Sequence, residues 1–185
     1  MSLTVYQLGD LHYLQCSCGL NYLMCLCVSM IATSYHGAAC RIIKAQRIRS
    51  IQEKGAQKIE DGIEGEFIGI INYCIIALIQ KSLEGSDQME FAPEELGRIY
   101  DEQVEITLEL LRNKNHDYGE AWRDMRISSM TDLILMKIFR TKQIENNDGK
   151  TLVSEGVEAN YQDMLNYAVF CLITLKGEQQ QQQQQ

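Results

Sequence analysis

Several kinds of residue are scarce in this chain of 185 residues, and each scarcity narrows the possible folds. Proline occurs once, as Pro93, and aromatic residues make up 8% of the chain with a single tryptophan. Because proline interrupts helices, a chain with one proline and many Leu, Ile, Glu, Gln and Lys residues favours an all-α fold. No segment offers the roughly 20 consecutive apolar residues that a membrane-spanning helix needs, so we expect no membrane contact.

Positive charge is also in short supply. The chain has 17 Lys and Arg residues against 25 Asp and Glu residues, a net charge of −8. Proteins that bind the nucleic-acid backbone neutralise phosphates with Lys and Arg, so we expect no binding of that kind. An excess of carboxylates suits hard divalent cations instead. A composition of 45% hydrophobic and 23% charged residues excludes disorder throughout, and the length fits about one domain.

Charge is almost missing from residues 1–40, which form an atypical Cys-rich segment. Asp10 is the one charged residue there, and the segment holds five of the seven cysteines: Cys16, Cys18, Cys25, Cys27 and Cys40. The CxC spacing does not favour zinc, and without Lys or Arg the segment makes a poor secretory signal. A disulfide framework is also not expected, because the chain shows no export signal and has enough apolar residues to form a core. We expect a buried apolar helix with incidental cysteines, in a cytoplasmic protein.

The rest of the chain is predicted to be a series of helices. Pro93 suits the first turn of a helix, and Ser129-Met130-Thr131-Asp132 matches a capping box that would begin another. Residues 178–185 form a Gln-rich tail that is either disordered or an extension of the last helix. The apolar spacing predicts helices over residues 41–52, 64–83 and 93–112, a helical run over 133–139, and a last helix that ends near 175.

Two blocks of the sequence resemble each other. A shift of 93 or 94 residues relates Lys44, Arg47, Gly62, Glu64, Asn72 and Tyr73 to Lys137, Arg140, Gly156, Glu158, Asn166 and Tyr167. Coincidence between two amphipathic helices is the alternative, but it supplies Leu and Ile more readily than these polar pairs. We therefore predict a helical bundle with a pseudo-twofold axis, built from related hairpins within residues 41–85 and 86–177.

Three polar clusters in the second half are candidates for chemistry. They are Lys114 to Gly119 followed by Trp122, then Lys137 with Arg140, and then Glu155, Glu158, Asp163, Asn166 and Tyr167 on one predicted helix. Each has a plain structural alternative: a helix end with a core tryptophan, a solvated basic stripe and a solvated acidic face. Carboxylates beside Lys and Arg on a neighbouring helix could form a Mg²⁺-bridged phosphate site. The sequence contains no glycine-rich phosphate loop and no defensible Ser-His-Asp or Cys-His spacing.

These motifs also resemble a known family. The stretch Lys114-Asn-His-Asp-Tyr-Gly-Glu-Ala-Trp122, then Lys137-xx-Arg140, then Asp163-Met-Leu-Asn166-Tyr167-Ala168 resembles the nucleotide modification associated domain family of bacteria and phages. The match covers roughly residues 94–175. Residues 41–83 resemble the same family's second motif region, but no Asp-Tyr-Gly or tryptophan counterpart precedes them. The family is distantly similar to the all-α, MazG-like nucleoside triphosphate pyrophosphohydrolases.

This resemblance implies a Mg²⁺-dependent nucleoside triphosphate pyrophosphohydrolase in nucleotide or modified-base metabolism, assembled as a homodimer. Glu155, Glu158 and Asp163 would hold the metal, with Glu158 and Asp117 as the catalytic residues. Lys114, Lys137 and Arg140 would contact phosphates, Tyr118 or Trp122 would stack on the base, and Asn166 and Tyr167 would also contact the substrate. A non-catalytic nucleotide-binding protein and a purely structural helical protein are the alternatives.

Overall fold

All regular secondary structure in the described part of the chain is helical. The computed structural model describes residues 34–55, 62–84, 91–147 and 156–183, and none of them forms a strand. The α-helices are α3 (Ser34–Lys54), α4 (Ile63–Ser82), α5 (Pro93–Tyr118), α6 (Ile127–Asn146) and α7 (Val157–Gln182), with a short 3-10 helix, η2 (Ala121–Asp124), before α6. The predicted all-α class is confirmed. The predicted Cys-rich segment lies mostly outside the described residues, and α3 begins within its last few positions.

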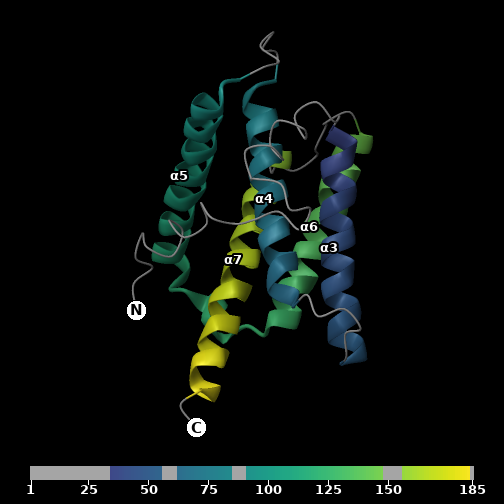
Figure 1. The fold of residues 1–185 in the computed structure, drawn as a ribbon, viewed down its shortest axis with the longest axis vertical. Coiled ribbons are helices and arrows are strands. Elements are labelled where there is room, and N and C mark those ends of the chain that lie inside the picture. Colours follow the sequence, from purple (N-terminus) through teal and green to yellow (C-terminus); the bar gives the residue numbers. More distant parts are fainter. Residues whose placement is uncertain (1–33, 56–61, 85–90, 148–155, 184–185) are drawn as a thin grey trace.

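The helices form a bundle around two central helices, α4 and α7. These two helices pack closely along each other and run in opposite directions (Figure 1). Helix α3 packs on α4, α6 packs on α7, and α3 and α6 also contact each other. Helix α5 lies against α4 on the side away from α3 (Figure 1). The bundle therefore contains two similar helix pairs, α3–α4 and α6–α7, with α5 as an outer helix.

The helix starts agree with the internal repeat predicted from the sequence. Helices α3 and α6 begin at Ser34 and Ile127, and α4 and α7 begin at Ile63 and Val157. The separations are the same 93 and 94 residues that relate the two sequence blocks. The two helix pairs are thus placed as a duplicated hairpin requires, although the duplication itself stays a prediction.

Helix α4 is the centre of the hydrophobic core. Its side chains Phe67, Ile70, Ile71 and Ile79 are completely buried, as the nearly continuous apolar sequence predicts. By length and hydropathy alone α4 could cross a membrane, but 61% of that apolar window is buried within the bundle. The packing of α4 therefore accounts for its apolar sequence, since core helices of water-soluble proteins have the same character.

Two predicted helix boundaries were wrong. Helix α5 continues to Tyr118 and ends at Gly119, whose φ of 63° is the left-handed conformation typical of a helix C-terminus. Ser129 lies inside α6 rather than at its cap, because α6 begins two residues earlier at Ile127 and has no side-chain cap. Of the two alternatives for the Gln-rich tail, extension of the last helix is confirmed, because α7 continues to Gln182.

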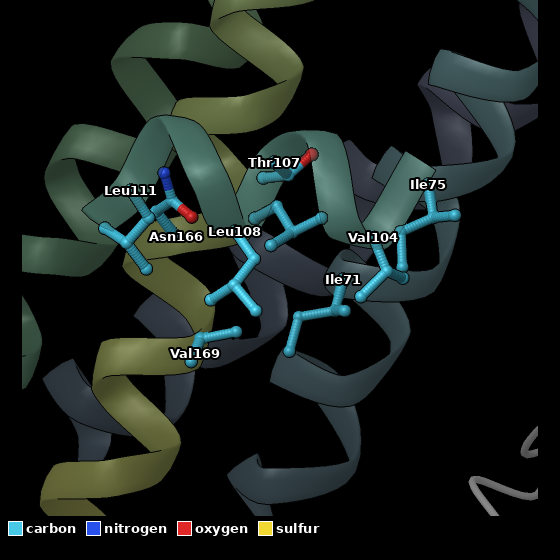
Figure 2. Close-up of a pocket in the computed structure, with 9 residues that line it drawn as sticks. Ile71, Ile75, Val104, Thr107, Leu108, Leu111, Asn166 and Val169 are labelled. Atoms are coloured by element: carbon cyan, nitrogen blue, oxygen red, sulfur yellow. The ribbon is translucent and has the colours of Figure 1, made fainter. Parts of the chain in front are cut away.

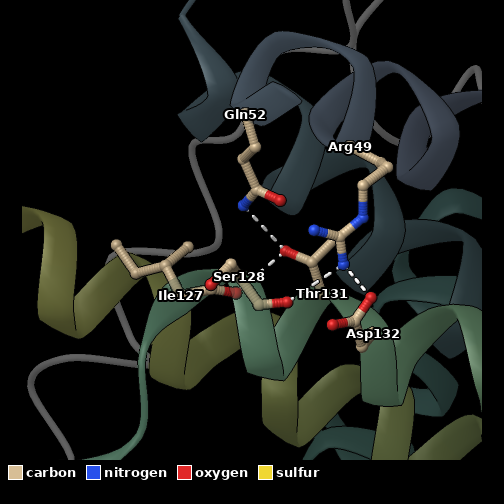
Figure 3. A network of polar contacts seen from close by, with 6 residues as sticks. All are labelled: Arg49, Gln52, Ile127, Ser128, Thr131 and Asp132. Atoms are coloured by element: carbon tan, nitrogen blue, oxygen red, sulfur yellow. Dashed lines mark hydrogen bonds and ion pairs between the residues drawn. The ribbon is translucent and has the colours of Figure 1, made fainter. Parts of the chain in front are cut away.

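Polar contacts join α3 to α6 near one end of the bundle (Figure 3). The Arg49 guanidinium donates to the Ser128 carbonyl at 3.1 Å and forms an ion pair with Asp132. The Gln52 amide donates to the Thr131 hydroxyl at 3.0 Å. These contacts fix how α3 and α6 lie relative to each other, and both helices carry cations that point toward the central helices.

Candidate functional site

Three helices meet at the carboxylate of Asp163. Its Oδ1 accepts from the ammonium of Lys114 on α5 at 2.6 Å, and its Oδ2 lies 2.7 Å from the ammonium of Lys137 on α6. The Asp163 side chain is only 13% exposed, whereas Lys137 is 19% and Lys114 is 38% exposed. We call Lys114, Lys137 and Asp163 the Asp163 cluster. Three of the residues predicted from the sequence are therefore brought together.

Two ammonium groups face one carboxylate in the Asp163 cluster. The formal charges of these three side chains alone sum to +1. A lysine ammonium has three donors, and the contact of Lys114 with Asp163 uses one of them. Ion pairs that are shielded from water interact more strongly than exposed ones. The arrangement is suited to an anion with several acceptor oxygens, such as phosphate.

Trp122 lies in an aromatic cluster beside α7. Its ring is stacked on that of Phe170, with 4.2 Å between centroids and an interplanar angle of 2°. The Arg123 guanidinium lies 4.4 Å from the centroid of the same ring. Two groups this close must occupy opposite faces, so neither face of Trp122 is open to a base. Stacking of a base on Trp122 would require these groups to move, whereas Tyr118 is 75% exposed.

A small gap lies between α4, α5 and α7 and is lined almost entirely by apolar side chains (Figure 2). The two polar residues that line the gap are Thr107 and Asn166. The Thr107 hydroxyl donates to the Gln103 carbonyl in its own helix. Asn166 is 5% exposed, and its Oδ1 has no hydrogen-bond partner among the described residues. Tyr167, the next predicted residue, makes an edge contact with Phe170. The predicted Asn166 and Tyr167 thus lie on different sides of α7.

Three other predicted site residues, Asp117, Arg140 and Glu158, are exposed on the surface of the bundle. Asp117 is exposed and contacts the exposed ring of His116 at 3.2 Å. Arg140 and Glu158 are also exposed, and the described residues show no contact between either of them and Asp163. Glu155 lies outside the described residues, so its predicted role is not tested.

The described residues alone do not form the predicted Mg²⁺ site, and its third predicted ligand, Glu155, lies outside them. Among them, no group of three or more His, Cys, Asp or Glu side chains lies close enough together to hold a metal ion. Of the predicted ligands, Asp163 is already held by two lysines and Glu158 is exposed at the start of α7. A metal ion bound by Asp163 would lie beside two ammonium groups, and their positive charges would repel it.

A second cluster, which was not predicted from the sequence, lies in the first half. The buried carboxylate of Glu66 on α4 accepts from Lys44 at 3.2 Å and forms an ion pair with Arg47, both on α3. Glu66 is 7% exposed, and a carboxylate buried on an apolar helix requires such partners. Its position among the isoleucines of α4 was the signal that could have revealed it.

When the two halves of the chain are aligned, the carboxylates of the two clusters occupy positions about one helical turn apart. Under the shift of 94 residues, Glu66 corresponds to Asn160, and Gly69 corresponds to Asp163. At Gly69 the space of a side chain is filled by Lys44, because a Cβ added there would overlap the Lys44 side chain. The first half therefore keeps the lysine of the Asp163 cluster but pairs it with a different acid.

A buried arginine joins both helix pairs. The Arg41 guanidinium donates to the Tyr73 carbonyl at 3.1 Å and to the Tyr161 hydroxyl at 3.3 Å, and it lies 4.6 Å from the centre of the Tyr161 ring. The Tyr161 hydroxyl in turn donates to Glu145 at 3.2 Å. Burial raises the pKa of Tyr161 to about 12, although Arg41 opposes the change. This network links α3, α4, α6 and α7.

Comparison with models of protein families identifies the family of this chain. The model of a family described as nucleotide modification associated domain 1 matches residues 40–81 and 114–175, more than half of the chain. The chain belongs to this family. No curated protein and no solved structure matches the chain.

The matched residues contain both charged clusters. The segment 40–81 includes Lys44, Arg47 and Glu66, and the segment 114–175 includes the whole Asp163 cluster. Membership of the family was predicted from the motifs and is confirmed. It associates the chain with nucleotide modification but assigns no catalytic activity.

Proposed function

We propose that this chain binds a nucleotide, with the phosphate group at the Asp163 cluster. The observation that carries the proposal is the convergence of Lys114 and Lys137, from two different helices, on one carboxylate. The family's association with nucleotide modification supplies the class of ligand. The overall negative charge of the protein is consistent with a small anionic ligand at a local positive site rather than with a long nucleic acid.

Asp163 preorganises Lys114 and Lys137 for binding a phosphate group. Its contacts hold both flexible side chains in one place, which reduces the conformational entropy lost when an anion binds. A phosphate with two negative charges would more than neutralise the excess charge of the cluster. The ligand would therefore share the lysine donors with Asp163, and the carboxylate would act as a positioning residue.

Mg²⁺-dependent hydrolysis of a nucleoside triphosphate to the monophosphate and pyrophosphate is the second candidate. The acidic first turn of α7, with Glu158, favours it, and Glu155 would have to complete a metal site. Because the described residues do not form that site, we derive no step through the metal. Binding is the conclusion that the geometry supports better.

We also propose a homodimer in the cytoplasm. Large apolar side chains remain exposed on the outer helices: Ile43 on α3, and Met136 and Phe139 on α6. Ile43 and Met136 correspond to each other under the shift of 93 residues, so a second copy would meet similar groups on both helices. The molar mass from light scattering tests this, because a monomer at micromolar concentration would exclude it.

A thermal-shift assay in EDTA tests nucleotide binding. Canonical and modified-base nucleoside mono- and triphosphates should raise the melting temperature of the wild type. Lys137→Met should weaken binding about tenfold or more, since a hydrogen bond to a charged group contributes about 1.5–3 kcal/mol. Lys142→Met is the matched control, because Lys142 is an exposed lysine on the same helix. Equal shifts for the wild type and Lys137→Met would exclude the proposed site.

Pyrophosphate release tests the second candidate separately. The same triphosphates would be assayed with Mg²⁺ and with EDTA, using the wild type and Glu158→Gln. Release that needs Mg²⁺ and is lost in Glu158→Gln would establish hydrolysis. Binding in EDTA without any release would leave the chain as a nucleotide-binding protein.

A further inference from the structure

An aligned position in α4 and α7 carries a charge in only one half of the chain. It is Glu66 in the first half and Asn160 in the second, which correspond under the shift of 94 residues. We propose that Glu66 closes the first half to anions with its own carboxylate, and that the neutral Asn160 leaves the second half open to a phosphate group. This inference rests on the proposed function, because it assumes that a phosphate binds at the Asp163 cluster. It adds the residue that decides which half binds the ligand, and a third cation for the phosphate, Arg140.

The cations of the first half are already paired with an acid of the same chain. Glu66 Oε2 accepts from the Lys44 ammonium at 3.2 Å, and Glu66 Oε1 forms an ion pair with Arg47. The Glu66 side chain is better buried than either cation. A ligand anion that reached these cations would meet the carboxylate at close range, where like charges repel and salt screens them little. The first half is therefore closed to a phosphate group by its own acid.

The second half has the matching cations but no acid at this position. Under the shift of 93 residues, the two cations of α3 correspond to Lys137 and Arg140 on α6. The Asn160 amide donates to the Gly156 carbonyl at 2.9 Å, and its Oδ1 has no hydrogen-bond partner among the described residues, so Asn160 holds neither cation. Arg140 is exposed, and its guanidinium forms no hydrogen bond or ion pair with any residue that the structure describes. Arg140 thus lacks the acid that its counterpart has.

Asp163 does not close the second half as Glu66 closes the first, because the two acids occupy aligned positions about one turn apart. In the first half, Gly69 stands at the position of Asp163, and the lysine lies against this glycine on its way to Glu66. In the second half, Lys137 pairs with Asp163 instead. Arg140 follows Lys137 by about one turn on the same face of α6. A phosphate group between Lys137 and Arg140 would take the place that Glu66 fills in the first half.

Arg140 also raises the positive charge that is available to a ligand. Three cations and one carboxylate give a formal sum of +2 for Lys114, Lys137, Arg140 and Asp163. The three side chains that pair in the first half sum to +1. A phosphate group with two negative charges would neutralise the second-half site, and a planar guanidinium can donate two parallel hydrogen bonds to it. The second half is therefore the better site for a phosphate group.

Calorimetric titration of inorganic pyrophosphate in EDTA tests the inference. The proteins are the full-length wild type and the variants Asn160→Glu, Asn160→Gln, Glu66→Gln, Arg140→Met and Lys142→Met. Asn160→Gln is the matched control for Asn160→Glu, because the two new side chains have the same length and differ in charge. Lys142→Met is the control for Arg140→Met, because Lys142 is an exposed cation on the same helix. Thermal melting without ligand shows which variants fold.

We expect one pyrophosphate per wild-type chain. Asn160→Glu should weaken binding at least tenfold relative to Asn160→Gln, because the new carboxylate would repel the anion and pair with its cations. Arg140→Met should weaken binding about tenfold, and Lys142→Met should not. Glu66→Gln should bind two pyrophosphates per chain, because the cations of α3 are then without the Glu66 carboxylate. If Asn160→Glu does not fold, Asn160→Asp adds the same charge with the shape of the wild-type amide and should give the same loss.

Several results would overturn the inference and leave the proposed function standing. They are two pyrophosphates per wild-type chain, equal affinities in Asn160→Glu and Asn160→Gln, an unchanged affinity in Arg140→Met, or a single pyrophosphate in Glu66→Gln. The proposed function fails instead if Lys137→Met binds pyrophosphate as tightly as the wild type.

Discussion

Replacing Asp163 by asparagine should change stability and phosphate affinity in opposite directions. The carboxylate accepts two ammonium groups, at 2.6 Å from Lys114 and 2.7 Å from Lys137. Lys114 is 38% exposed, so screening by solvent limits its contribution to about 0.5 kcal/mol. The better-buried bond to Lys137 contributes about 1.5 kcal/mol. The loss of about 2 kcal/mol corresponds to a fall in melting temperature of about 4–8 °C for a chain of this size.

The same substitution should strengthen anion binding. A phosphate oxygen on the far side of the lysines would lie about 5–6 Å from the carboxylate, given ordinary charge-assisted hydrogen-bond lengths. At an effective dielectric constant of about 20, the repulsion between two unit charges at that distance is about 3 kcal/mol. The looser lysines in Asp163→Asn offset part of this gain. We therefore expect pyrophosphate and nucleotides to bind about tenfold more tightly.

Thermal unfolding and calorimetric titration in EDTA measure the two effects on the same protein. Asp132→Asn is the control, since Asp132 is an exposed carboxylate on α6 that pairs with Arg49. It should change neither quantity appreciably. Weaker ligand binding in Asp163→Asn would refute the reasoning, because it would mean that the positioning of the lysines by Asp163 outweighs its repulsion of the anion.

Three further predictions concern buried groups. Because burial raises the pKa of Tyr161 from 10 to about 12, its stabilising contribution is present below pH 10 and is lost as the pH rises toward 12. Urea unfolding should show about 1 kcal/mol of this loss by pH 11, and Tyr161→Phe should abolish it. Burial also raises the pKa of Cys74 and Cys171 to about 12, so iodoacetamide at pH 8 should label neither thiol until the protein unfolds; rapid labelling in the native state would contradict their burial. Glu66→Gln should lower the melting temperature, as it leaves the cations of α3 without their carboxylate, and an unchanged value would mean that these ion pairs contribute nothing.

Local sequence patterns predicted the fold well because they follow helix geometry. The single proline marks the start of α5, and the apolar run of α4 predicted its central position. Helix ends were less predictable. The polar residues after Arg112 resemble a turn, but they continue α5 until Gly119, where the left-handed conformation ends it. Ser129 resembles a cap, yet α6 already begins at Ile127, after Arg126 in an extended conformation and without a side-chain cap.

The candidate site was only partly predictable, because contacts between helices leave weak signals in a sequence. Lys114, Lys137 and Asp163 were all identified, but as ligands of phosphate and metal rather than as partners of one another. Glu66 was missed because the partners of a buried acid lie on another helix, 19 and 22 residues away. The internal repeat matched Lys44 to Lys137 correctly. It could not show that the acids that pair with these lysines, Glu66 and Asp163, occupy aligned positions one helical turn apart.

Titration of inorganic pyrophosphate into the wild type in EDTA tests the central claim most directly, since this ligand has neither a base nor a sugar. We predict saturable binding without any metal, about tenfold weaker in Lys137→Met and unchanged in Lys142→Met. Equal affinities in all three proteins, or no binding until Mg²⁺ is added, would contradict a phosphate site made by the lysines around Asp163.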